Sequence, residues 1–151
     1  MRHLLIAFLI SLSLFGQNTE EELLHSITPY AIRLGDGPEK IYAFIDPLCP
    51  KSQEYIKHIF NDKKLQKQSS FYLFLYELPS LHSEFLITYI YQSKNPLEAL
   101  EEIMIYEEYD IQEEPMHTQT RAMTSQIKQV AQKVQVTHRP YLFIFEKDEF
   151  D

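Results

Sequence analysis

The stretch IYAFIDPLCPKS, residues 41–52, changes its hydrophobic period in the middle. Its first half lies in Lys40–Ile45, a short and nearly continuous apolar run, which predicts a strand buried on both faces of a mixed or parallel sheet. Pro50 suits the first turn of a helix because its missing N–H costs nothing there. Apolar residues at the spacing of one helical face follow, namely Tyr55, Ile56, Ile59 and Phe60. Cys49, the only cysteine of the chain, is therefore expected at a helix N-terminus.

On either side of this stretch, helical and strand patterns alternate. Gly35–Pro38 predicts a hairpin turn after the first strand, and Asn95 is the expected cap of a helix. The aromatic run 71–76 is expected in the core, and the polar stretch 107–119 is expected to be a surface loop. The predicted helices are Glu20–Ser26, Pro50 onward, Leu81–Gln92, Pro96–Met104 and Thr118–Val134, and the predicted strands are Tyr30–Leu34, Lys40–Ile45, Ser70–Leu78 and Pro140–Phe145.

The ends of the chain differ in composition from its middle. A basic start, an apolar run and an abruptly polar segment predict a signal peptide at residues 1–16, with an uncleaved anchor as the alternative. Residues 17–39 are expected to hold an N-terminal segment and strand, residues 40–151 the main domain, and residues 146–151 an acidic tail. We expect a periplasmic protein. The formal net charge of −8 argues against nucleic acid as a partner.

A single cysteine carries more meaning in an exported chain. Disulfides form in oxidising compartments, yet one cysteine cannot form a disulfide within its own chain. Cys49 is therefore a reactive thiol, a residue that forms a mixed disulfide with a partner, or a small buried residue that only packs. The His residues lack metal-site spacing, so neither a metal nor another cofactor is expected.

Three stretches together resemble periplasmic thiol-disulfide isomerases of the DsbC/DsbG kind. IYAFIDPLCPKS is similar to the family's strand and Cys-x-x-Cys turn, and YIYQSKNPLEALEEIM to its helix, turn and next helix. QVAQKVQVTHRPYLFIF is similar to its last helix and the strand that a cis-proline opens. The resemblance implies an α/β, thioredoxin-like fold with a central mixed sheet and a helical insertion, shortened at its C-terminus.

The sequence departs from that family at its reactive turn. Cys49 matches the attacking cysteine, but Ser52 stands where the resolving cysteine would be. Arg139 replaces the family's threonine before the cis-proline. From the resemblance we also expect the family's dimerisation domain, last strand and last helix to be missing here. The resemblance implies catalytic roles for Cys49, Lys51 and Ser52, and substrate binding by His138, Arg139 and Pro140.

The sequence is compatible with two functions. The first is a monothiol isomerase or reductase, in which the helix N-terminus and Lys51 stabilise the Cys49 thiolate. The second is a redox-inactive binding module or chaperone, in which Lys51 and Ser52 are ordinary helix residues and Arg139 is a surface cation. Expected partners are cysteine-containing periplasmic proteins or a redox partner, and oligomers are possible. Another chain or the strand at Tyr30–Leu34 is expected to cover the sheet edge left open by the last strand.

Overall fold

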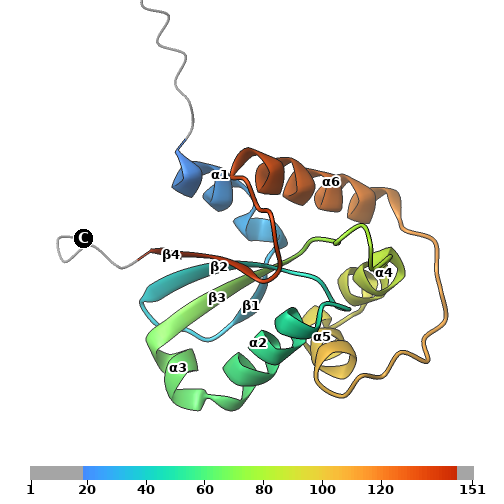
Figure 1. Ribbon diagram of the computed structural model, residues 1–151, viewed down its shortest axis with the longest axis horizontal. Coiled ribbons are helices and arrows are strands. Elements are labelled where there is room, and N and C mark those ends of the chain that lie inside the picture. Colours follow the sequence, from blue (N-terminus) through green and yellow to red (C-terminus); the bar gives the residue numbers. More distant parts are fainter. Residues whose placement is uncertain (1–18, 146–151) are drawn as a thin grey trace, which may run out of the picture.

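Two parallel strands form the centre of the sheet. β2 (Glu39–Ile45) and β3 (Ser69–Leu75) pair in register along their full length. β1 (Ile32–Leu34) runs antiparallel to β3, and β4 (Tyr141–Phe145) runs antiparallel to β2, which gives the order β1-β3-β2-β4 (Figure 1). This computed structural model describes residues 19–145, so the expected signal peptide and acidic tail lie outside the described residues.

Helices cover both faces of the sheet, because side chains that alternate along β2 and β3 are apolar on both sides. One face carries a core around Ile41, Ala43 and Leu73, and the other carries an aromatic core around Phe44 and Phe74. Figure 1 shows α1 and α6 on the aromatic side and α2, α4 and α5 on the other. The helices are α1 (Glu20–Ser26), α2 (Pro50–Asn61), α3 (Lys63–Gln68), α4 (Glu84–Gln92), α5 (Pro96–Met104) and α6 (Thr118–Lys133).

Most predicted elements are confirmed, with shifts at their ends. The bounds of α1 and α5 and the cap at Asn95 agree with the prediction. The first strand begins later than predicted because Thr28–Tyr30 forms a turn of 3₁₀-helix. The strand predicted to reach Leu78 ends at Leu75, and α4 begins at Glu84 instead of Leu81. The short helix α3 was not predicted.

The hairpin predicted at Gly35–Pro38 is wrong. β1 pairs with β3, so the chain leaves β1 and enters β2 two positions away in the sheet. The glycines serve a close approach to another segment, since Gly35 has φ +79° and an added Cβ on Gly37 would lie 2.1 Å from the Ser69 nitrogen. Ser70 Oγ also donates to the Gly37 carbonyl at 2.6 Å. Local turn chemistry cannot reveal which distant strand a turn packs against.

The sheet edge at β4 is not covered by the N-terminal strand, so that half of the expectation is also wrong. β1 lies at the opposite edge of the sheet. Within residues 19–145 no strand pairs with the outer side of β4, and Leu142 and Ile144 are 39% and 56% exposed. In the same part of the chain, no helix is both long and apolar enough to cross a bilayer.

Candidate functional site

Cys49 lies at the junction that the sequence predicts, where β2 has ended and α2 begins. It is the N-cap residue of α2: its N–H donates to the Asp46 carbonyl at 3.1 Å, and its own carbonyl accepts from the Gln53 N–H at 2.9 Å. The thiol donates to the carbonyl oxygen of Arg139 at 3.6 Å, across 90 positions of sequence. The fold therefore brings together the two motifs at the centre of the resemblance.

The thiol is shielded in this conformation. Cys49 is 7% exposed, and its side chain makes no capping hydrogen bond to the helix. The following peptide bond of Arg139, to Pro140, is cis. Cys49 thus lies between the start of α2 and the loop that holds Arg139 and Pro140.

The other two residues of the turn lie in different environments. Lys51 is exposed in the first turn of α2, where its ammonium adds positive charge to the helix N-terminus. Ser52 is fully buried, and its Oγ accepts a hydrogen bond from the Asp46 N–H at 3.3 Å. The hydroxyl at the position of a resolving cysteine thus supports the turn that precedes Cys49.

The Arg139 side chain is 5% exposed, so its interpretation as a surface cation is wrong. Its guanidinium stacks on the Tyr76 ring at 3.9 Å and donates to the carbonyls of Tyr76, Glu77 and His138 at 2.7, 3.1 and 3.0 Å. Burial lowers the pKa of this guanidinium below its usual value, and neighbouring Tyr76 and Asp46 oppose that shift. Arg139 meets Cys49 through its backbone carbonyl.

The neighbours of Arg139 are the parts of this loop that a partner could contact. His138 is exposed and its ring lies 4.7 Å from the Tyr141 ring, centroid to centroid. Pro140 is half-buried. His138 and Pro140 are thus the accessible side chains on either side of the buried Arg139.

Sequence reasoning missed the structural importance of Asp46, which was not among the predicted site residues. The carboxylate is fully buried. It accepts from the Leu48 N–H at 2.8 Å, from Ser83 Oγ at 2.9 Å and from the Leu78 N–H. A charged residue directly after a buried strand was the available signal, because a buried carboxylate needs several partners.

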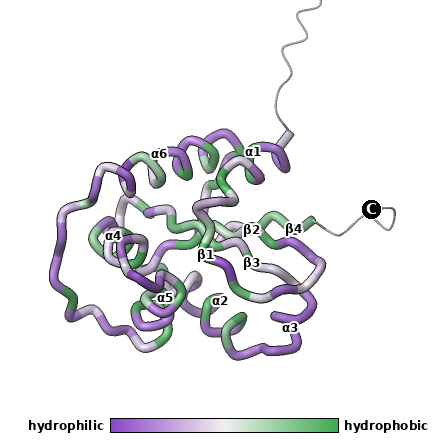
Figure 2. Tube along the Cα trace, turned by 180° about the vertical axis from the view of Figure 1, so that it is seen from behind, coloured by the Kyte–Doolittle hydropathy of each residue, from purple (hydrophilic) through white to green (hydrophobic). Residues whose placement is uncertain are grey.

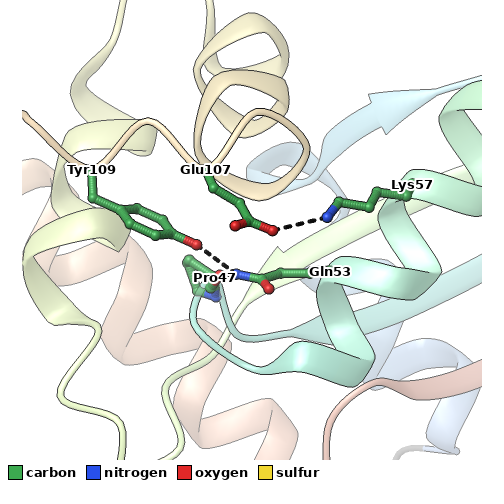
Figure 3. A network of polar contacts seen from close by, with 5 residues as sticks. All are labelled: Pro47, Gln53, Lys57, Glu107 and Tyr109. Atoms are coloured by element: carbon green, nitrogen blue, oxygen red, sulfur yellow. Dashed lines mark hydrogen bonds and ion pairs between the residues drawn. The ribbon is translucent and has the colours of Figure 1, made fainter.

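The connection between α5 and α6 is the surface loop that the sequence predicts, but the sequence did not reveal how this loop is attached to α2. These residues, 105–117, carry exposed tyrosines and acidic side chains and are largely hydrophilic (Figure 2). Figure 3 shows where the connection meets α2: Gln53 Nε2 donates to the Pro47 carbonyl at 2.9 Å and to Tyr109 Oη at 2.8 Å. Lys57 forms an ion pair with Glu107 at 3.0 Å. The connection is thereby attached one helical turn from Cys49.

Replacing Gln53 by Ala is expected to loosen this connection. Two hydrogen bonds are lost, which should lower the free energy of unfolding by about 1–2 kcal/mol. Cleavage of the 105–117 connection by a glutamyl endopeptidase should become faster, because its Glu residues lose their attachment to α2. An equal cleavage rate in Gln53→Ala and in a control at the exposed Gln129, Gln129→Ala, would contradict this role.

No protein-family model matches the sequence, and no curated protein matches it. Solved structures do match its fold. The DsbG protein of Helicobacter pylori aligns with a TM-score of 0.63 at 17% identity, over 83% of this chain and 62% of that one. The present chain therefore spans less than two thirds of that protein.

Two further structures cover more of both chains. A disulfide interchange protein from Neisseria gonorrhoeae aligns with a TM-score of 0.59 at 17% identity, over 79% of this chain and 86% of that one. A periplasmic thioredoxin-like protein from Salmonella enterica serovar Typhimurium gives 0.60 at 11% identity, over 86% and 88%. The chain has an α/β, thioredoxin-like fold, as the sequence predicts.

Proposed function

We propose that this chain is an exported thioredoxin-fold protein that takes part in thiol-disulfide exchange through Cys49 alone. The observation that carries the proposal is the placement of Cys49 at the N-terminus of α2, with its sulfur 3.6 Å from the carbonyl oxygen of the residue before a cis-proline. A helix N-terminus stabilises a thiolate, and Lys51 adds positive charge. The structural neighbours described as disulfide interchange and periplasmic proteins support the same chemistry and location.

The reaction begins when the Cys49 thiolate attacks one sulfur of a client disulfide. A sulfur–sulfur bond forms between Cys49 and that sulfur, the client disulfide breaks, and the released client thiolate takes a proton from water. Another thiolate of the same client then attacks the client sulfur of the mixed disulfide and releases Cys49 as a thiolate. The client is rearranged with no net oxidation. With two molecules of a small thiol in its place, the client leaves reduced and the small thiol becomes a disulfide.

In this proposal the turn and the cis-proline loop have separate roles. Cys49 is the nucleophile, and Lys51 with the start of α2 stabilises its thiolate. Ser52 holds the turn through Asp46 and provides no second sulfur. Pro140 and His138, with the backbone of Arg139, would receive an extended client segment, because extended peptides pair with exposed backbone. The buried Arg139 side chain does not contact the client and instead binds backbone carbonyls below this surface.

A binding module without redox chemistry is the second candidate. The observation that favours it is the shielding of Cys49, which is 7% exposed and already donates to Arg139. Such a protein would use the same edge to hold an unfolded chain.

Replacing Cys49 by Ser separates these functions. For a chain that starts near residue 17, we expect the wild type to be trapped as a mixed disulfide with a secreted protein whose disulfides are scrambled. It should also speed the recovery of that client in the presence of a small thiol. Cys49→Ser should reduce both activities to the uncatalysed background, because the chain has one cysteine.

The control is an exposed serine of α6, changed in Ser125→Ala, which should react like the wild type. If Cys49→Ser speeds client recovery as well as the wild type does, the exchange function is wrong. Unchanged non-covalent binding of the reduced client by Cys49→Ser would then identify the protein as a binding module.

A further inference from the structure

Cys49 belongs to a closed ring of hydrogen bonds. The thiol contacts the Arg139 carbonyl, and the Arg139 guanidinium binds the carbonyls of Tyr76 and Glu77. The N–H of the same Glu77–Leu78 peptide group donates to the Asp46 carboxylate. The backbone carbonyl of Asp46 in turn accepts from the Cys49 N–H. Starting from Cys49, the contacts therefore lead through the cis-proline loop and the segment 76–78 back to Cys49.

Segment 76–78 is held from two sides by opposite charges. Carbonyl oxygens carry partial negative charge and face the guanidinium of Arg139, whereas the N–H of Leu78 faces the carboxylate of Asp46. Both charged side chains are at least 95% buried. Charge-assisted hydrogen bonds of this kind are stronger than neutral ones, so the peptide groups between the two charges are fixed in orientation.

The same carboxylate also ties in α4. Ser83 is the N-cap residue of α4, but its hydroxyl donates to Asp46 at 2.9 Å instead of capping its own helix. The other carboxylate oxygen accepts from the Leu48 N–H, one residue before Cys49. Asp46 is thus the point at which the Cys49 turn, segment 76–78 and α4 are joined.

We infer that Asp46 and Arg139 are a pair of positioning residues that fix the cis-proline loop relative to Cys49, through the segment 76–78 that they bind from opposite sides. The inference rests on the proposed function. In that function a client places its sulfur at Cys49 and its backbone at the loop around Pro140, so the distance between Cys49 and this loop must suit the client. We call Asp46, Arg139 and segment 76–78 the backbone clamp.

The clamp accounts for two departures from the family pattern at once. Arg139 stands where the resembled proteins have threonine, and its guanidinium donates to the carbonyls of Tyr76 and Glu77 from that position. Ser52 accepts from the backbone N–H of Asp46 and so supports the residue at the other side of the clamp. Both residues therefore take part in the hydrogen bonds around Cys49.

The test compares one chemical reaction on two probes. The first probe is a small symmetrical aryl disulfide, and the second is an extended peptide whose single cysteine carries the same aryl group in a mixed disulfide. In both cases the Cys49 thiolate attacks, a new disulfide forms, and a coloured aryl thiolate leaves. The ratio of the two rates reports how well the loop presents a peptide to Cys49, independently of the reactivity of the thiol.

We expect Asp46→Asn and Arg139→Met each to lower the ratio of peptide rate to small-probe rate by about ten-fold, because each leaves its buried peptide groups without their charged partner. Arg139→Lys should restore part of the loss, since it keeps the charge but cannot make the same set of contacts. The double variant should lose little more than the worse single one, because both residues act on one segment.

Two controls remove comparable groups elsewhere. Asp62→Asn removes a carboxylate that accepts from the Leu65 N–H at the start of α3, and Arg121→Met removes an exposed cation of α6. Both should keep the wild-type ratio. If Asp46→Asn or Arg139→Met does not fold, Ser83→Ala removes a single contact of Asp46 and should lower the ratio less, in the same direction.

The inference is wrong if the folded variants of Asp46 and Arg139 keep the wild-type ratio of peptide rate to small-probe rate. It is also wrong if Asp62→Asn lowers this ratio equally. Failure of the proposed function gives a different result, in which the wild type releases aryl thiolate from neither probe. In that case, the rate of alkylation of Cys49 by a haloacetamide tests the positioning roles of Asp46 and Arg139 separately. Faster alkylation in Asp46→Asn and Arg139→Met than in Asp62→Asn supports these roles, and equal rates contradict them.

Discussion

Changing Ser52 to Cys is expected to turn this single-thiol protein into one that stores a disulfide. Position 52 lies three residues after Cys49 in the first turn of α2, the spacing of the Cys-x-x-Cys turn that the sequence resembles. Ser52 is fully buried beside the same turn, so a sulfur there has no exposed alternative position. The wild type cannot form such a bond because Cys49 is its only cysteine.

The measurement is a thiol titration with intact mass. Reduced Ser52→Cys should show both thiols, and mild oxidation should remove both with the loss of two hydrogens and no covalent dimer. The wild type should keep its one thiol under the same treatment. The oxidised variant should also oxidise a dithiol peptide, which the wild type cannot do without an added oxidant.

A cysteine at the exposed position Ser125 of α6 serves as the control, since Ser125→Cys should form disulfides only between molecules. If oxidised Ser52→Cys keeps both thiols free, or forms only dimers, then position 52 does not stand in the geometry of a resolving cysteine. The correspondence drawn from the sequence would then be wrong.

Replacing Gly37 by Ala is expected to have the largest effect on stability. A Cβ at this position would lie 2.0 Å from the carbonyl carbon of Gln68 and 2.1 Å from the nitrogen of Ser69. Both are backbone atoms of the peptide bond that joins α3 to β3, and β3 is paired in register with β2. Relief of the overlap must therefore displace the central strand pair. We expect the free energy of unfolding to fall by about 3 kcal/mol or more.

Urea unfolding followed by circular dichroism measures this effect. Total stabilities of small domains are about 5–15 kcal/mol, so a loss of this size should raise the unfolded fraction sharply. The matched control is Asp36→Ala in the same turn, because Asp36 is exposed and its backbone N–H keeps its bond to the Gln66 carbonyl. A Gly37→Ala protein as stable as Asp36→Ala would show that this turn can move away from β3.

Much of the fold could be predicted because its patterns are local. The apolar run of β2 predicted a strand buried on both faces, and the aromatic run of β3 was expected in the core. β2 is buried from Ile41 to Ile45, and β3 is buried along its whole length. The predicted last helix is confirmed as α6, and its apolar residues Ile127, Val130 and Ala131, with Val134 at its end, pack into the aromatic core. The order of the strands could not be predicted in the same way. Gly35–Pro38 has the composition of a hairpin turn, and only the pairing of β1 with β3 shows that it is not one.

In the candidate site, too, local features could be predicted and long-range contacts could not. Period and composition placed Cys49 at a helix N-terminus, and the structure confirms that placement. The same reasoning left Arg139 open between a surface cation and a substrate-binding residue. The structure buries its side chain against segment 76–78, more than 60 residues earlier in the chain. Asp46 was underestimated for the same reason, because its partners Leu78 and Ser83 come from a loop and a helix that its own neighbourhood does not specify.

The sequence by itself determined the secondary structure around the reactive turn, since hydrophobic period, proline position and glycine content act within a few residues. It also determined that the chain carries a single thiol. The tertiary structure alone decided what that sulfur faces and what fixes it there. Hydrogen bonds and buried charges join groups by distance in space, and Cys49, Tyr76 and Arg139 become neighbours only when the sheet and its helices pack together.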